Sequence, residues 1–459
     1  MRLTLVAALL MGACSLVAAQ AADTAAEAVA GRILAAGLVR LGAYGMLEQL
    51  AARAPHRLSG SAGADSAVAL ARSFMLERGF SNVHLERVTV PRWVRGKVEK
   101  AYLHIRGGGK RMPLAVCALG GSIATPKGGV TADVVEVHSL DEVQKLGVTA
   151  AGKIIFYNRP MDPRLLNTFQ AYEGAVDQRS RGAIEAAKVG AVAVLVRSMT
   201  LAIDSVPHTG AMGYVDGVKK IPAAAISTRD AGVLSALVAR GVRPRVTLML
   251  SAKTLPDAVS ANVVGEITGE TSPRDVIVIG GHLDAWDKGT GANDDGAGCV
   301  QAIEALDILR TLGLKPKRTI RAVMFMNEEN GLRGGRAYPL DSLRRAETHV
   351  AMLESDAGGF APRGFYVDAD STVRARIARW IPALEHAGAG RFFPGRSAAD
   401  ISPMVAAGIP GFGLNPENQR YFDYHHSDRD TPEKVNPREL ELGAVAEAIL
   451  AWLVSEEGI

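Results

Sequence analysis

A short apolar run, Val276–Ile279, leads directly into a glycine-rich loop that carries several possible metal ligands. The loop extends to Gly298 and contains His282, Asp284, Asp294 and Asp295. In an open α/β fold the functional side chains gather at the carboxyl ends of the strands, and glycines let a loop turn tightly enough for short side chains to converge. Zinc takes histidine nitrogen and carboxylate oxygen as ligands. The pattern therefore predicts a buried strand that ends at a metal site.

Two further apolar runs end in carboxylates. Arg321–Met326 precedes Asn327-Glu328-Glu329, and Val350–Leu353 precedes Glu354-Ser355-Asp356. A fourth cluster, Tyr424 to Thr431, adds two histidines and two aspartates. A solvated acidic surface would explain any one cluster alone, but it does not explain why three of them follow β-like runs. Together they contain the ligands, the bridging carboxylate and the free carboxylate base that a two-metal hydrolase needs.

The order of elements after Asp257 predicts the fold class. Apolar β-like runs alternate with helical segments, which favours an α/β three-layer sandwich with a mostly parallel central sheet. The expected strands are Asn262–Ile267, Val276–Ile279, Arg318–Met326 and Val350–Leu353, and the expected helices begin at Ala297 and span Glu439–Ser455.

Between about Met112 and Ala252 the pattern changes to short β runs separated by glycine and proline turns. These runs are Ala132–Glu136, Lys153–Tyr157, Ala191–Arg197 and Val246–Leu250. We therefore expect a smaller β-rich domain inserted into the first. The expected division is residues 1–21 as a signal peptide, 22–111 and 253–459 as the two parts of the main domain, and 112–252 as the insert.

Five phrases occur in a fixed order along the chain: HLD, NDDGAG, NEE, ESD and YHHSxxDT. Together they resemble the co-catalytic di-zinc aminopeptidase family, and within it the branch that contains carboxypeptidase Q. The resemblance covers most of the chain and implies two Zn²⁺ ions. His282 and Asp356 would bind one ion, Glu329 and His426 the other, and Asp294 would bridge both.

The resemblance also implies roles around these ligands. Glu328 would be the general base and then the general acid, and Asp284 would fix the imidazole of His282. Asp295 would be structural, after a cis peptide bond that follows Asp294. The phrase Gly182–Ala187 with the run that follows it resembles a protease-associated domain, which fits the expected insert.

The residues that stabilise the oxyanion stay open. His425, Tyr421 and Tyr424 are the candidates. His425 could also replace His426 as the ligand, although the spacing to Asp430-Thr431 favours His426. In the insert, His208 is either a polar surface residue or a residue that contacts substrate.

The implied activity is hydrolysis of dipeptides or short peptides that have an unblocked terminus, by aminopeptidase or dipeptidase action. Carboxypeptidase specificity is the main alternative. A glutaminyl cyclase with one zinc shares the fold, but the insert disfavours this alternative. A binding protein without metals also shares the fold, but the complete ligand set disfavours it. The resemblance is compatible with a homodimer.

Composition and the first residues bear on location and partners. A net charge of +4 over 459 residues, with no basic block, excludes an obvious nucleic-acid site. Met1-Arg2, the apolar stretch Leu3–Met11 and the small residues at Ala19-Gln20-Ala21 predict a cleavable signal and a periplasmic or secreted enzyme. A lipoprotein site at Cys14 is the competing interpretation. No later stretch is long and apolar enough to cross a membrane. We expect Cys117 and Cys299 to be buried free thiols.

Overall fold

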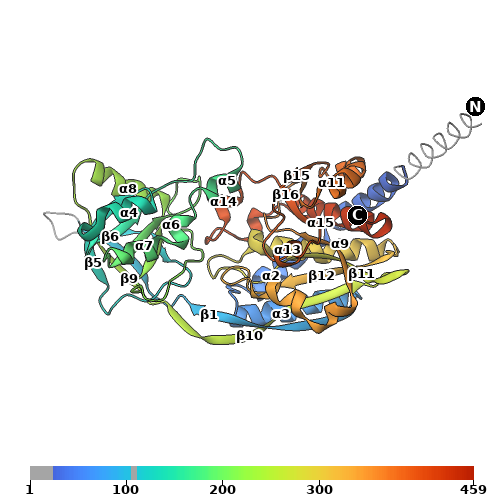
Figure 1. Cartoon of the computed structure of the whole chain (residues 1–459), viewed down its shortest axis with the longest axis horizontal. Coiled ribbons are helices and arrows are strands. Elements are labelled where there is room, and N and C mark those ends of the chain that lie inside the picture. The colour runs from blue at the N-terminus through green and yellow to red at the C-terminus, as the bar shows by residue number, and fades with distance from the viewer. Residues whose placement is uncertain (1–23, 105–110) are drawn as a thin grey trace, which may run out of the picture.

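The computed structural model describes residues 24–104 and 111–459, so the expected signal segment lies outside the described residues. The described chain forms two lobes, each built on an eight-stranded sheet (Figure 1). We call the lobe that holds β1 and β10–β16 the first lobe. The second lobe holds β2–β9.

The sheet of the first lobe has the order β1-β10-β12-β11-β13-β16-β14-β15. In that order the strands are Ser81–Val94, Lys253–Ile267, Arg318–Phe325, Ser272–His282, Thr348–Glu354, Gly411–Pro416, Pro362–Asp368 and Phe392–Pro394. The four central strands β12, β11, β13 and β16 are parallel, whereas β1, β10 and β14 pair in antiparallel fashion. The predicted α/β sheet is therefore parallel at its centre and mixed at its edges.

The alternation of side chains along β11 places one set on each face of this sheet. Ile277 and Ile279 join the large core under the main helices, and Val276 and Val278 join the smaller core on the opposite face. All four side chains are completely buried, as expected for a central strand covered on both faces. The main helices are α2 (Gly42–Arg53), α3 (Ala62–Glu77), α9 (Ala297–Thr311) and α15 (Pro437–Glu457).

Shorter helices complete the first lobe. They are α10 (Arg333–Ala337), α11 (Ser371–Ile377), α12 (Ile381–Glu385), α13 (Ser402–Ala406) and α14 (Tyr421–Tyr424), and a further helix runs through residues 24–40. Ile401 and Met404, at the start of α13, cover the smaller core.

The second sheet has the order β3-β2-β9-β5-β6-β7-β8-β4. In that order the strands are Arg111–Leu114, Glu99–His104, Arg245–Leu250, Val130–Val137, Ile154–Tyr157, Ala193–Arg197, Ala223–Ile226 and Val116–Ala118. Its helices are α4 (Leu140–Leu146), α5 (Thr168–Glu173), α6 (Asp177–Ser180), α7 (Gly182–Lys188) and α8 (Thr228–Ala239). The domain division at 112 and 252 stays a proposal, and β2, which precedes residue 112, pairs within this second sheet.

A two-stranded ribbon connects the lobes. β1 and β10 pair in antiparallel fashion from Ser81 and Glu266 to Val94 and Lys253, and they run from one lobe to the other (Figure 1). At the second-lobe end of the ribbon, Trp93 enters the core of the second sheet. This ribbon holds the second lobe against the edge of the first sheet where the parallel strands end.

Two expectations about the chain as a whole can be compared with the structure. Cys117 and Cys299 are both buried and free. Within the described ranges, every helix is either too short or too polar to cross a lipid bilayer.

A buried acidic pair between α9 and α15 predicts how stability depends on pH. Burial and the charge of Glu441 raise the pKa of Glu304 to about 8, although Arg40, 3.6 Å away, opposes the shift. Between about pH 4.5 and pH 8 the unfolded chain loses this proton while the folded chain keeps it. The free energy of unfolding should therefore fall as pH rises through this window.

We expect Glu304→Gln to remove this part of the pH dependence. As pH rises from about 5 to about 8, the unfolding free energy of the parent protein should fall by on the order of 2 kcal/mol more than that of the variant, measured by urea unfolding. Glu48→Gln, at an exposed position of α2, is the matched control and should leave the slope unchanged. Equal slopes for the Glu304 variant and the parent would contradict the assignment.

Candidate metal centre

The three predicted ligand clusters meet at one edge of the first sheet because their strands are parallel neighbours. β11 ends at His282, which lies opposite Phe325 of β12, and Gly280 lies opposite Glu354 of β13. The residues that follow each strand therefore emerge side by side. This is the arrangement that the sequence predicts.

Asp294 lies between two sets of possible ligands. Its Oδ1 is 3.2 Å from His282 Nε2, which is itself 3.4 Å from Asp356 Oδ1. Its Oδ2 is 3.2 Å from His426 Nε2, which is 3.0 Å from Glu329 Oε2. Each carboxylate oxygen of Asp294 thus faces one histidine and one further carboxylate, so the residue is placed to bridge two cations.

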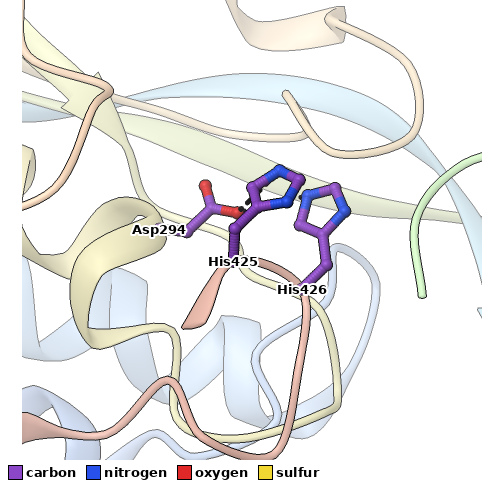
Figure 2. A group of neighbouring side chains, drawn as sticks. All are labelled: Asp294, His425 and His426. Carbon is purple, nitrogen blue, oxygen red and sulfur yellow. Dashed lines mark ion pairs between the residues drawn. The ribbon is translucent and has the colours of Figure 1, made fainter. Parts of the chain in front are cut away.

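His425 and His426 both approach Asp294 (Figure 2). Their rings stack with centroids 3.5 Å apart. His425 Nε2 lies 3.7 Å from Asp294 Oδ2, farther than His426 Nε2 at 3.2 Å. Of these two histidines, His426 is the one that also pairs with Glu329. The geometry therefore favours His426 as the ligand, and it places His425 beside the ligand set.

The loop that carries Asp294 is held by backbone hydrogen bonds. The Asp294–Asp295 peptide bond is cis, as the resemblance implies. Asp295 accepts hydrogen bonds from the backbone nitrogens of His282 and Gly298, at 3.0 and 2.9 Å. Asp295 is fully buried and serves a structural role.

Asp284 acts differently from the expectation. The ring Nδ1 of His282 lies 2.9 Å from the backbone oxygen of Asp284, whereas the Asp284 carboxylate is 4.0 Å away. That carboxylate instead accepts the backbone nitrogens of Asn327 and Glu328, at 2.7 and 3.0 Å. Asp284 therefore fixes the histidine through its main chain and fixes the turn that carries Glu328 through its side chain.

Two residues that the sequence did not single out as part of the site also hold the loop. Asp430 accepts the backbone nitrogens of Asn293 and Asp294, at 2.7 and 3.1 Å. The buried guanidinium of Arg57 donates to the backbone oxygens of Leu283, Thr290 and Gly291. Ser61, in the same segment as Arg57, caps α3 by accepting a hydrogen bond from the backbone nitrogen of Ala64.

The carboxyls of the site fit a bound cation. Burial raises the pKa of Glu329 to about 7, with the charge of His426 opposing the shift, and burial raises the pKa of Glu328 well above its ordinary value. Asp294 Oδ2 is buried and accepts no hydrogen bond from the described residues. Positive charge would satisfy this acceptor and would keep the carboxyls ionised. Two histidines and several carboxylates form a donor set that suits zinc.

These side chains line a cavity of about 230 Å³ between the lobes. The first lobe contributes Asp294, Glu328, Glu329, Asp356, Tyr421, Phe422, His425 and His426, and the second lobe contributes Phe169, Tyr172, Arg179 and Ala211. A second cavity of about 530 Å³ shares Phe169 and Asp356 with it. The site is therefore a pocket with walls from both lobes.

The three oxyanion candidates differ in position. Tyr421 and His425 line the cavity. Tyr424 stacks on Phe360 at 6.4 Å, outside that wall. His208 lies behind the site, where its Nδ1 is 2.7 Å from the backbone oxygen of His425. It supports the histidine turn rather than the cavity surface.

Comparison with known proteins agrees with this geometry. The model of peptidase family M28 matches residues 262–453. Carboxypeptidase Q of Mus musculus is 38% identical over 400 residues, which cover 87% of this chain and 83% of the relative. Carboxypeptidase Q of Homo sapiens is 37% identical over 87% of this chain and 82% of the relative.

Solved structures show the same fold over nearly the whole chain. The peptidase M28 precursor from Shewanella amazonensis SB2B has a TM-score of 0.90 at 34% identity, and the match covers 95% of this chain and 98% of that one. The zinc aminopeptidase from Bacillus subtilis has a TM-score of 0.63 at 21% identity, with 90% and 95% covered, and supports the fold alone. The sequence relatives and the first of these structures show that the chain belongs to peptidase family M28 and is a zinc metallopeptidase.

Proposed function

We propose that the protein is an exopeptidase that uses two zinc ions to hydrolyse dipeptides or short peptides with an unblocked terminus. The observation that carries this proposal is the position of Asp294, which presents one oxygen to each of two histidine–carboxylate pairs. His282 and Asp356 would hold one ion and His426 and Glu329 the other. Zinc supplies Lewis acidity toward the peptide carbonyl and lowers the pKa of a nearby water.

The protein's own base is Glu328. It lines the cavity and is partly accessible from it, and its backbone is fixed by the carboxylate of Asp284. In this position the carboxylate can accept a proton from the attacking water and later donate it to the leaving amine. Tyr421 and His425 lie in the same wall and are the available donors toward the oxyanion.

The small volume of the cavity supports short substrates. A volume of about 230 Å³ with walls from both lobes has room for a peptide of about two residues, smaller than the usual ligand pocket. Two relatives are named carboxypeptidase Q, and these names fit the alternative of carboxypeptidase specificity. Export to the periplasm or outside the cell, and a homodimer, belong to the same proposal.

The role of Glu328 is tested by Glu328→Gln. We expect zinc content and thermal unfolding to stay at parent values while kcat falls roughly 10²–10⁴-fold, because the amide cannot accept the proton. Glu433→Gln, at an exposed position two residues after the YHHSxxDT segment, is the control. Retention of full activity by the Glu328 variant would exclude it as the base.

The bridging role is tested by Asp294→Ala. Loss of the carboxylate removes a ligand from both sites at once, so bound zinc should fall from two ions per chain to at most one, measured by atomic absorption after dialysis. Activity should fall with the metal. Two tightly bound ions in this variant would contradict a bridge at Asp294.

The specificity is tested with one dipeptide in two forms, with a free and with an acetylated amino terminus. We expect the zinc-loaded protein to cleave only the free form, measured by release of the carboxy-terminal amino acid. Cleavage of both forms would favour carboxypeptidase action. Cleavage of neither form, with two ions bound, would contradict the proposed function.

A further inference from the structure

A tryptophan from the loop that follows β11 lies in the core of the second lobe. Trp286 is 2% exposed and packs with Trp93 and the apolar side chains of the second sheet. Among the described residues, it is the only member of this core that comes from the chain after Ala252. The loop that leads from the ligand His282 to the bridging Asp294 is therefore anchored in the other lobe.

The indole fits tightly against the second lobe. A Cβ built on Gly120, which follows β4, would lie 1.8 Å from Cη2 of Trp286. The backbone of Gly120 is itself fixed, because its nitrogen donates to the oxygen of Gly210 and its oxygen accepts from the nitrogen of Met212, both at 2.9 Å. The indole Nε1 has no hydrogen-bond partner among the described residues. Packing against the second lobe therefore sets where the ring lies.

The main chain of Trp286 holds a predicted zinc ligand. Its nitrogen donates to Glu329 Oε1 at 3.0 Å, and the other oxygen, Oε2, faces His426 Nε2 at 3.0 Å. The indole also meets the ring of His426 edge to face, with centroids 5.8 Å apart. A hydrogen bond to the free side of a ligand orients it toward the metal and raises the affinity of the site. Trp286 therefore contacts both terminal ligands of one ion.

The next residue ties the same loop to the second lobe by charge. Arg95, at the second-lobe end of the ribbon, is 7% exposed, and its Nε lies 2.9 Å from both carboxylate oxygens of Asp287. Arg95 also donates to the hydroxyl of Thr209 at 3.2 Å, and the backbone nitrogen of Thr209 donates to the oxygen of His426 at 2.9 Å. A forked pair of this kind is geometrically specific. The loop and the histidine turn are thus held by the same set of contacts.

The other pair of ligands is held from within the first lobe. His282 Nδ1 lies 2.9 Å from the backbone oxygen of Asp284, and the backbone nitrogen of His282 donates to Asp295 at 3.0 Å. Asp356 pairs with His282. Within the described part of the chain, the hydrogen bonds and ion pairs of these two ligands stay in the first lobe. The two predicted zinc sites therefore depend on different parts of the protein for their geometry.

We propose that Trp286 is a positioning residue that makes the affinity of the His426–Glu329 zinc site depend on contact with the second lobe. The His282–Asp356 site takes its geometry from the first lobe and keeps its ion when that contact is disturbed. This inference rests on the proposed two-zinc centre. It gives the second lobe a role in metal binding in addition to its place in the cavity wall.

The first test adds one methyl group to the second lobe, on a residue that contacts no ligand. Apoprotein with Gly120→Ala is titrated with zinc in competition with a chromophoric chelator, which resolves the two binding steps. One step should keep the parent affinity, and the other should weaken roughly 10–100-fold because the indole is displaced. Activity should return when free zinc is raised by the same factor. Gly232→Ala in α8, where an added Cβ meets no atom within 4 Å, is the matched control and should leave both steps unchanged.

A second change tests whether the tryptophan carries this effect. Phenylalanine lacks the outer ring of the indole, so Gly120→Ala combined with Trp286→Phe should bind the weakened ion more tightly than Gly120→Ala alone. Trp286→Phe by itself should weaken the same step, because the smaller ring holds the loop less firmly. This variant also tests the proposal should Gly120→Ala fail to fold. Trp380→Phe, at an equally buried position in the first-lobe core, should leave both steps unchanged.

Glu329→Gln identifies the step that is weakened. This variant should lose the same ion as Gly120→Ala and retain the other, and adding Gly120→Ala to it should leave the affinity for the retained ion unchanged. Loss of both ions in Glu329→Gln alone would show that the two sites fill together, which contradicts their separate support.

The remaining outcomes are distinguishable. Equal weakening of both steps in Gly120→Ala or Trp286→Phe would mean a general effect on the fold and would overturn the proposal. Parent affinity for both ions in Trp286→Phe would overturn it as well. A parent protein that binds fewer than two zinc ions would instead contradict the two-zinc centre on which the proposal rests.

Discussion

The site depends on the placement of one carboxylate by hydrogen bonds that come from a distant part of the chain. Asp430 accepts the backbone nitrogens of Asn293 and Asp294 and thereby fixes the turn from which Asp294 projects. Asp430 lies four residues after His426. One short segment therefore supplies a ligand and also orients the bridge that this ligand faces. Buried hydrogen bonds to a carboxylate are among the stronger ones, so the two clusters are expected to keep their relative position.

The second lobe takes part in the same construction. The backbone nitrogen of Thr209 donates to the backbone oxygen of His426 at 2.9 Å, and His208 Nδ1 lies 2.7 Å from the backbone oxygen of His425. His426 has a φ of +59°, a left-handed conformation that costs a non-glycine residue roughly 1–3 kcal/mol and persists only where its surroundings hold it. These two contacts from the other lobe are such surroundings. The ribbon of β1 and β10 keeps the lobes together, so the ligand turn is supported from both sides.

Much of this centre can be predicted from sequence, because its ligands follow apolar strands. Val276–Ile279 predicts a buried strand, and the parallel pairing of β11 with β12 and β13 brings His282, Glu329 and Asp356 to one edge. The role of Asp430 could not be predicted in the same way, since its partner Asp294 is 136 residues away and no local pattern connects them. The sequence predicts a contact between Asp284 and His282, but it does not tell whether the carboxylate or the backbone oxygen makes that contact. Arg179 belongs to no motif, and only the docking of the second lobe brings it to the cavity.

The charged groups of the cavity come from both lobes. The first lobe contributes the carboxylates of Asp294, Glu328, Glu329 and Asp356 to the cavity wall, and the second lobe contributes the guanidinium of Arg179. This cavity of about 230 Å³ adjoins a second cavity of about 530 Å³, with which it shares Phe169 and Asp356. For a dipeptide, removing the amino-terminal residue is the same reaction as removing the carboxy-terminal residue. Under the proposed function, a dipeptide substrate would therefore remove the distinction between aminopeptidase and carboxypeptidase action.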